Sequence, residues 1–419
     1  MHKINILEYL KSICFIILFA WISFFPQPIQ EKFWAYTVVF LGIFLLLLIL
    51  NKEYRYGLFS FKDWPFWIFL ICLFSGTISA ANKDIALKTY FYLILTFSPL
   101  FYIGKSIFRN EKSRDFICIT ICLCSSIVAI IGLLELYFGK NIIYEKFIFN
   151  PYYARNIEWY SNNYIKNAGW YPQAMSTQLN PAVLGSYLLA SLAFGFYLLK
   201  KPSFSLKLLG AASSFLCVIM IIFTFSRGVF LGFIALILFY LWNAGLKRLF
   251  VVFVLCSILL VSISSFAKDT NFYRFGFKRM IFGIYDSAIS EYRLDRIKMT
   301  YVILKDYPVY GIGFQHFRIR FNEFYERVKG KQEIKGNYEF MILDNMYLTF
   351  LAESGIIGML GFLVFIIFLL KNTIKKYKIL LIPISVLIGL LVNMSAYELF
   401  YWNNPYMFFC LICGFIKSI

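Results

Sequence analysis

One arginine stands alone between two long apolar stretches of the chain. Arg227 lies in the turn Ser226-Arg227-Gly228, with apolar runs at 206–225 and 228–243 on either side. A charged side chain at membrane depth is costly and usually marks a binding or catalytic site. The alternative is a short loop whose arginine extends to the lipid headgroups. We favour a functional arginine, because a turn built from Ser226 and Gly228 does not otherwise need a cation.

Two further arginines lie one helical turn apart in the polar region that follows. Arg293 and Arg296 are separated by three positions, so a helix places them on one face. Their planar guanidinium groups suit the oxygens of a phosphate or diphosphate. A solvated helix face without a ligand is an equally good interpretation of this spacing.

An acidic residue opens the tenth long apolar run. Asp344 and Asn345 precede that run, and Glu353 lies about two helical turns inside it. An Asp at a helix start is most often an N-cap, and the spacing favours that role. Asp344 could instead act as a general base toward an acceptor hydroxyl. Glu353 is either a buried structural partner or a second polar contact within a cavity.

The remaining polar candidates are weaker. His316, the only histidine besides His2, is a candidate for contact with the substrate. Glu135 and Glu398 lie at the ends of apolar runs, where they could pair with the arginines. The sequence has no Gly-rich nucleotide loop, no DxD-like pair and no cluster with metal-ligand spacing. We therefore expect neither a nucleotide-sugar donor nor ATP, and neither a metal nor another cofactor.

The composition indicates an integral membrane protein. Of the 419 residues, 60% are hydrophobic and only 15% are charged, which leaves too little polar surface for a soluble domain. The net charge of +19 fits cytoplasmic loops rich in Lys and Arg, together with an anionic ligand such as a diphosphate. No soluble basic domain is available to bind nucleic acid. All nine cysteines fall in apolar runs, which predicts packing among lipid-embedded helices without disulfides or a zinc site.

The apolar runs predict an all-α polytopic protein of about twelve transmembrane helices in a single membrane domain, 1–419. Sixteen Lys and Arg residues lie in one set of short loops and four in the other set, which places the first set and both termini in the cytoplasm. No cleavable signal peptide is expected, because the first run reads as a membrane span. The runs are 12–26, 33–50, 65–81, 87–107, 116–138, 180–199, 206–225, 228–243, 249–267, 346–370, 379–396 and 405–417.

This topology leaves two long polar segments on the outer face. The first, 139–179, is rich in Tyr, Trp and Asn, which favours a position along the membrane surface, with stacking on sugar rings as the alternative. The second, 268–345, lies between spans nine and ten and has helical periodicity over 291–305. It breaks at Gly311-Ile312-Gly313, where glycines mark a turn. We expect this partly helical segment to carry part of the active site.

Taken in order, these motifs resemble the bacterial O-antigen ligase/polymerase family, the lipid-linked glycan transferases of the inner membrane. The resemblance covers roughly residues 210–365, and the twelve-span layout extends it to the whole chain. Each motif is weak alone, whereas the ordered set is fairly specific. The matching residues are Ser226-Arg227-Gly228 with Leu231, Arg293 through Pro308 to Gly311-Ile312-Gly313, and Asp344-Asn345 through Glu353 and Gly355.

The resemblance implies a GT-C-like, metal-independent, inverting glycosyltransferase. Its donor would be a glycan on undecaprenyl diphosphate at the periplasmic face of the bacterial inner membrane. Arg227 and Arg293 would hold the diphosphate with support from Arg296, which suits a leaving group whose growing charge meets fixed cations. Asp344 would position or deprotonate the acceptor hydroxyl. The candidates for acceptor contact or support are His316, Asn345 and Glu353.

The resemblance implies the same donor for both branches of the family but leaves two acceptors open. Ligases of the family usually have a histidine where this chain has Asp344, so Asp344-Asn345 favours the polymerase branch, which joins repeat units to one another. The alternative is an O-antigen ligase that transfers the finished glycan to lipid A core. A transporter of lipid-linked oligosaccharides is a remote alternative, because the charged candidates gather at one face and no paired halves are evident.

Overall fold

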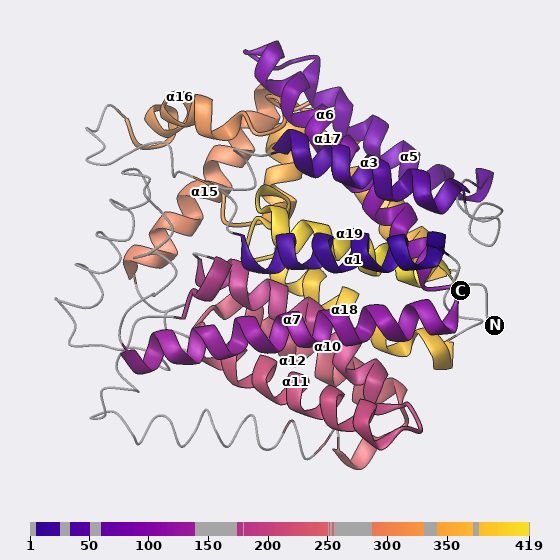
Figure 1. The fold of residues 1–419 in the computed structure, drawn as a ribbon. Helices are drawn as coiled ribbons and strands as arrows, with labels where there is room; N and C mark the ends of the chain where they lie inside the picture. The colour runs from indigo at the N-terminus through magenta and orange to yellow at the C-terminus, as the bar shows by residue number, and fades with distance from the viewer. Residues whose placement is uncertain are drawn as a thin grey trace.

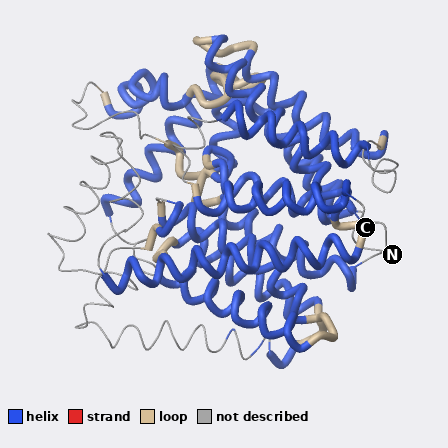
Figure 2. The backbone as a smooth tube through the Cα atoms, viewed as in Figure 1, coloured by secondary structure: helices blue, strands red, loops and turns tan. Residues whose placement is uncertain are grey.

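The computed structural model describes residues 6–25, 34–50, 60–138, 174–178, 180–249, 251, 254, 287–330, 342–371 and 377–418. Within these ranges the chain forms helices and connecting loops with no β-strand (Figure 2). The all-α expectation is therefore confirmed for the described chain. Its eight described cysteines are free thiols, buried or half-buried among the helices.

The described helices follow the apolar runs of the sequence closely. The run 249–267 lies almost wholly outside the described residues, and the other eleven runs each coincide with a helix. The α-helices are α1 (Ile6–Phe24), α3 (Trp34–Leu50), α5 (Trp64–Phe74), α6 (Lys83–Ile107), α7 (Glu111–Phe138), α10 (Pro181–Leu199), α11 (Phe204–Phe223), α12 (Arg227–Asn243), α15 (Ser287–Asp306), α16 (Phe317–Lys329), α17 (Met346–Lys371), α18 (Tyr377–Met394) and α19 (Asn403–Ser418). The described 3-10 turns are η1 (Phe61–Asp63), η2 (Ser75–Thr77), η4 (Ser176–Gln178) and η8 (Leu399–Tyr401).

Five of the described helices, α6, α7, α10, α11 and α17, are long and apolar enough to cross a membrane. Five shorter apolar helical stretches accompany them, namely Leu10–Phe24, Ala35–Leu50, Trp64–Thr77, Arg227–Asn243 and Leu380–Met394. The helices lie side by side in one bundle, with α19 near its centre (Figure 1). Nearly every residue of α19 is buried, as expected for a helix that is surrounded by other helices. The chain is a membrane-embedded helical protein.

Helix α12 approaches α18 closely, and this contact positions Arg227. A Cβ atom on Gly232 would lie 2.4 Å from the carbonyl oxygen of Gly389 on α18, so the two backbones touch. Small residues permit such close approach between membrane helices. One turn earlier, a Cβ on Gly228 would lie 2.8 Å from Asn393 Oδ1 and 2.9 Å from the Cβ of Ala396. The first turn of α12 is therefore held against the end of α18.

Helices α15 and α16 form a small unit of their own at one end of the bundle. Helix α1 begins and α19 ends at the opposite end (Figure 1). The unit packs onto the first turns of α17 through a second hydrophobic core, separate from the main one. Part of the predicted outer segment is therefore an ordered helical cap on the bundle. The core consists of Met299, Ile303, Ile312, Phe317, Phe321, Phe324, Leu343 and Ala352.

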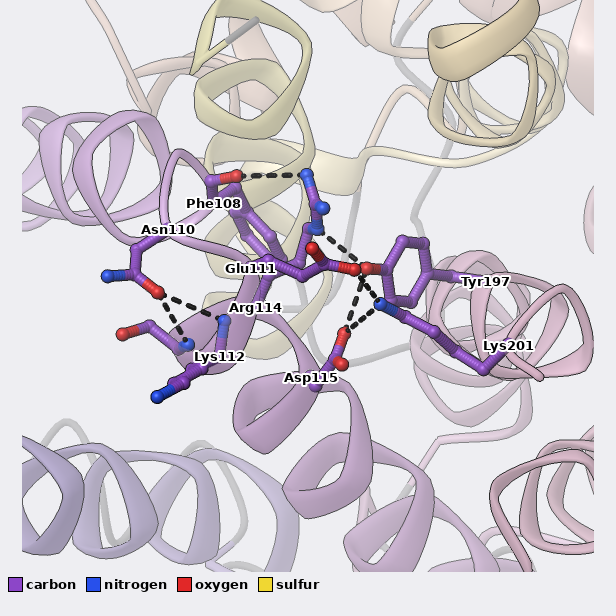
Figure 3. A network of polar contacts seen from close by, with 9 residues as sticks. Phe108, Asn110, Glu111, Lys112, Arg114, Asp115, Tyr197 and Lys201 are labelled. Carbon is purple, nitrogen blue, oxygen red and sulfur yellow. Dashed lines mark hydrogen bonds and ion pairs between the residues drawn. The ribbon is translucent and has the colours of Figure 1, made fainter. Parts of the chain in front are cut away.

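A charged network fixes the start of α7 to the end of α10 (Figure 3). Lys201 Nζ lies 2.7 Å from Glu111 Oε1 and 2.8 Å from Asp115 Oδ1. The Tyr197 hydroxyl accepts a hydrogen bond from Arg114 Nε at 2.7 Å and donates one to Asp115 at 2.9 Å. Because the charges neutralise one another, we assign this cluster a structural role.

Candidate active site

The Arg227 turn is built from a strained residue and a tightly packed helix start. Phe225 has a positive φ of 48°, which is uncommon for a bulky side chain. Helix α12 begins at Arg227, whose side chain is half-buried. The backbone N–H of Ala174 donates to the carbonyl of Phe223 at 3.3 Å, so a second chain segment also borders the turn.

That bordering segment, 174–178, is the described end of the first polar segment. All five of its residues are buried, and Glu135 Oε2 accepts hydrogen bonds from the N–H groups of Met175 at 3.0 Å and Ser176 at 2.7 Å. We expected segment 139–179 to lie along the membrane surface. Its described end instead packs inside the bundle, whereas its Tyr- and Trp-rich part lies outside the described residues.

Asn345 makes the N-cap of α17. Its side-chain oxygen accepts hydrogen bonds from the N–H groups of Tyr347 at 3.0 Å and Leu348 at 3.1 Å. The spacing had favoured Asp344 as the cap, and the structure corrects this by one residue. Asp344 itself is half-buried and has a positive φ of 52°. Asn and Asp tolerate that conformation better than other side chains.

Asp344 and Arg227 are brought to the same connection, residues 395–398 between α18 and η8. The side-chain amide of Asn345 donates to the carbonyl of Ser395 at 2.8 Å. Ala396, the next residue, packs against Gly228 beside Arg227. Two motifs more than a hundred residues apart therefore meet at one short stretch of chain.

Glu398 completes this connection. Its Oε1 accepts hydrogen bonds from the Leu343 N–H at 2.8 Å and from Thr349 Oγ1 at 2.7 Å, rather than from an arginine as we had considered. Burial, with a smaller contribution from the charges of Asp344 and Glu353, raises its pKa to about 8, although the hydrogen bonds from Thr349 and Leu343 act in the opposite direction. At neutral pH this carboxyl is therefore mainly protonated.

Glu353 is a buried structural partner, the first of the two roles that the sequence left open. Its Oε2 accepts from the Gln315 N–H at 2.8 Å, and its Oε1 accepts from the Phe317 N–H at 3.0 Å and from the Tyr401 hydroxyl. The side chain is fully buried. A carboxylate on α17 thus stabilises the first turn of α16, where backbone N–H groups lack helical partners.

The predicted glycine turn packs against α17 at Gly355, where the helix is interrupted. Gly355 inside α17 has φ +65°, and Gly311 has φ +69°. A Cβ on Gly311 would lie 2.4 Å from the carbonyl carbon of Glu353, and one on Gly355 would lie 2.2 Å from the oxygen of Val309. Neither position has room for a side chain, so the two glycines are needed for close packing of the backbone.

His316 lies in the same loop and is fully buried. Its Nδ1 is 3.0 Å from the carbonyl oxygen of Phe314, and its Nε2 is 2.9 Å from that of Asn82. Asn82 caps the start of α6, accepting from the Ile85 N–H at 3.1 Å. His316 therefore ties the outer unit to α6.

The two arginines of α15 differ in their surroundings. Arg293 is exposed, whereas Arg296 is 2% exposed, so the two side chains do not share a solvated face, which was one of the two interpretations of their spacing. The guanidinium of Arg296 lies over the rings of Phe321 at 4.7 Å and Phe317 at 5.8 Å. This geometry is that of a buried cation–π contact.

Sequence reasoning missed two residues of this region, Arg318 and Tyr401. Arg318 lies in a stretch of many charges, and Tyr401 in the short connection before the last apolar run. The guanidinium of Arg318 lies 4.8 Å from the ring centroid of Tyr401. Only the density of aromatic and polar residues at 397–403 could have drawn attention to this connection.

Comparison with protein families matches residues 212–363 to the family described as O-antigen ligase. The matched range holds Arg227, Arg293, Asp344 and Glu353. Comparison with curated proteins finds no match. The family match supports the assignment to the O-antigen ligase/polymerase family, and its description fits the ligase alternative better than the polymerase that Asp344-Asn345 had favoured.

Proposed function

We propose that this chain, as a member of the O-antigen ligase/polymerase family, transfers a glycan from undecaprenyl diphosphate to an acceptor sugar at the periplasmic face of the inner membrane. An O-antigen ligase with lipid A core as acceptor is the form that the family match supports best. The observation that carries the proposal is the meeting of the Arg227 turn and Asp344-Asn345 at residues 395–398.

The proposed reaction is a single displacement at the anomeric carbon of the donor sugar. The acceptor hydroxyl forms the new C–O bond, and the bond to the diphosphate breaks with its electron pair, which inverts the anomeric configuration. Arg227 and the exposed Arg293 bind the departing diphosphate and stabilise its growing charge. Arg296 supports Arg293 by fixing α15 on α16 through its ring contacts.

Asp344 is the proposed acceptor of the hydroxyl proton. Its backbone is held on both sides, by Glu398 at Leu343 and by Ser395 at Asn345. Because Asn345 caps α17, the Asp344 carboxylate is not needed for that purpose. Asn345, Glu353 and His316 act as positioning residues in this scheme, through the backbone contacts described above.

The proposed topology is a GT-C-like arrangement of about twelve spans with both termini cytoplasmic. Two observations support it. Lys and Arg are concentrated in one set of loops, and α15 and α16 lie at the end of the bundle opposite the start of α1 and the end of α19 (Figure 1). The active site would then face the periplasm.

A polymerase is the second candidate, and one observation favours it. Asp344 occupies the position where ligases of the family usually have a histidine. A carboxylate can take the same proton, so the donor chemistry is unchanged and only the acceptor differs.

The test uses the purified protein in liposomes with an undecaprenyl-diphosphate oligosaccharide, with and without lipid A core. Product on the core supports the ligase, and a ladder of longer lipid-linked glycans without the core supports the polymerase. Arg227→Ala should abolish either product, whereas Arg109→Ala, an exposed arginine between α6 and α7, should not. Folded protein that forms neither product, or Arg227→Ala with full activity, would overturn the assignment.

A further inference from the structure

The cations of α16 are paired with carboxylates, with one exception. Arg320 Nη2 lies 2.7 Å from Glu323 Oε1, Arg327 pairs with Asp306, and Lys329 Nζ lies 3.1 Å from Asp295. Arg318, at the start of the same helix, has no ion pair and no hydrogen bond to any described residue. A guanidinium carries five N–H donors, so this site has unused binding capacity.

Arg318 is half-buried, and its Nε atom is fully shielded without a partner among the described residues. Its guanidinium lies over the face of the Tyr401 ring, 4.8 Å from the ring centroid. Leaving a buried donor unsatisfied costs free energy, which makes it a candidate for a ligand. Glu353 does not fill this role, because both of its oxygens already accept hydrogen bonds from Gln315, Phe317 and Tyr401.

The adjacent connection before α19 holds further donors of the same kind. The Tyr397 hydroxyl, Trp402 Nε1 and Asn403 Nδ2 are buried atoms without a partner in the described chain. The Tyr397 and Trp402 rings stack, with centroids 6.2 Å apart and 19° between their planes. The Tyr397 hydroxyl interacts electrostatically with Arg318, Asp344 and Glu398, so these groups lie near one another.

Glu398 adds one more group to this neighbourhood. Its Oε1 is occupied by Leu343 and Thr349, whereas its Oε2 is buried and has no partner among the described residues. Because burial raises its pKa to about 8, Glu398 is mainly uncharged at neutral pH and does not repel an anion.

We propose that Arg318, Tyr397, Trp402 and Asn403 form an anion-binding subsite next to Asp344, which takes a phosphate group of the lipid-linked donor or of the acceptor oligosaccharide. The inference rests on the proposed function for the identity of that substrate. An anion is the matching ligand, because the unpartnered atoms are donors and one belongs to a cation. The site also lies at the N-terminus of α19, where the helix dipole favours negative charge. Arg318 and Trp402 are half-buried, so the subsite is open at one edge.

Binding measurements on the full chain in lipid nanodiscs test the subsite without requiring turnover. The probes are undecaprenyl diphosphate, phosphorylated lipid A core oligosaccharide, and the same oligosaccharide after phosphatase treatment. Arg318→Ala should weaken binding of one charged probe by about tenfold or more, as expected for a charge-assisted hydrogen bond. Arg320→Ala is the matched control on the same helix, because Arg320 is already paired, and it should change Kd by less than about twofold.

The probe that is affected identifies the source of the anion. A loss confined to undecaprenyl diphosphate assigns the subsite to the donor, and a loss confined to the phosphorylated oligosaccharide assigns it to the acceptor. Tyr397→Phe keeps the ring and removes the hydroxyl, and Trp402→Phe keeps an aromatic ring and removes the indole N–H. Each should weaken binding of the same probe. Unchanged Kd values for every probe, or equal losses in Arg318→Ala and Arg320→Ala, would overturn the subsite. Because binding is measured directly, an inactive enzyme that still binds through Arg318 would disprove the proposed transfer and leave the subsite standing.

Discussion

The Oε1 atom of Glu398 accepts a 2.8 Å hydrogen bond from the backbone N–H of Leu343, the residue before Asp344. The same oxygen accepts a 2.7 Å bond from Thr349 in the first turn of α17. On the other side of Asp344, Asn345 is bound to the Ser395 carbonyl. These contacts hold Asp344 at a positive φ that an unrestrained chain would rarely adopt.

The raised pKa of Glu398 predicts a specific pH dependence of stability. Glu398 lies in the connection between α18 and α19, and burial raises its pKa from an ordinary 4.5 to about 8. Between these values the folded protein holds a proton that the unfolded chain has lost, so stability falls as pH rises, by at most about 1.4 kcal/mol per unit. Below pH 4.5 and above pH 8 this contribution is constant. Glu398→Gln, which cannot titrate, should have a shallower slope than the unmodified protein between pH 5 and 8 in thermal unfolding followed in detergent; parallel profiles would contradict the prediction.

Substitutions at Asp344 and Asn345 should have different effects, because Asp344 is proposed to act in the reaction and Asn345 caps helix α17. Asp344→Asn keeps a residue that tolerates positive φ and removes the carboxylate, so activity should fall by about a hundredfold or more with little change in melting temperature. Asn345→Ala removes the cap of α17 and should destabilise the protein by about 1 kcal/mol. Asn345→Asp, which keeps a capping oxygen, is its control. Full activity in Asp344→Asn would exclude Asp344 as the base.

The backbone interlock of Gly311 and Gly355 should be intolerant of any side chain. Alanine at either position meets backbone atoms of α17 or of the opposing turn within 2.4 Å, in addition to the cost of the positive φ. We expect losses of several kcal/mol, roughly what a core substitution costs, and separation of the outer unit from α17. Limited proteolysis within 307–330 measures that separation.

Gly245→Ala is the matched control for this interlock. Gly245 also has a positive φ, +76°, but a Cβ there meets nothing within 4 Å. It should therefore cost only about 1 kcal/mol, from the backbone conformation alone. Equal effects at Gly245 and Gly355 would show that contact with Val309 does not matter.

Within the described residues, the sequence was sufficient to predict where the apolar helices lie. The run 405–417 corresponds to α19 (Asn403–Ser418), and 87–107 corresponds to α6 (Lys83–Ile107), because hydropathy is a local property of the chain. The helix ends extend into polar residues that hydropathy does not count. Asn82, which caps α6, is one such residue.

Side-chain partners could not be predicted in the same way. Asp344 and Asn345 are both good capping residues, and only the docking of Asn345 on Ser395 decides which one caps α17. The bonds from Glu353 to the loop at 315–317 join elements whose separation in the sequence gives no signal of contact. Tertiary packing creates these relationships, so the spacing of motifs indicates the site but not its internal geometry.

Arg293 and Arg296 should behave differently despite their identical side chains. Arg296→Ala removes a buried cation–π contact with Phe321 and should lower stability by about 1–2 kcal/mol, whereas Arg296→Met, which keeps much of the packing, should lower it less. Arg293 is exposed, so Arg293→Ala should leave the melting temperature unchanged and lower activity by raising the KM for the lipid-linked donor. Loss of stability in Arg293→Ala with an unchanged KM would argue against diphosphate binding at this position.

Cysteine labelling should place α16 and the connection between α10 and α11 on opposite sides of the membrane. Glu326 on α16 and Ser203 before α11 are both exposed, and the nine native cysteines lie in apolar runs. Since the loop at 200–207 carries three lysines, the positive-inside bias puts it in the cytoplasm. A membrane-impermeant maleimide added to spheroplasts should therefore label Glu326→Cys at once and Ser203→Cys only after permeabilisation. The reverse pattern would move α15, α16 and the proposed site to the cytoplasmic face, where the proposed periplasmic acceptor is absent.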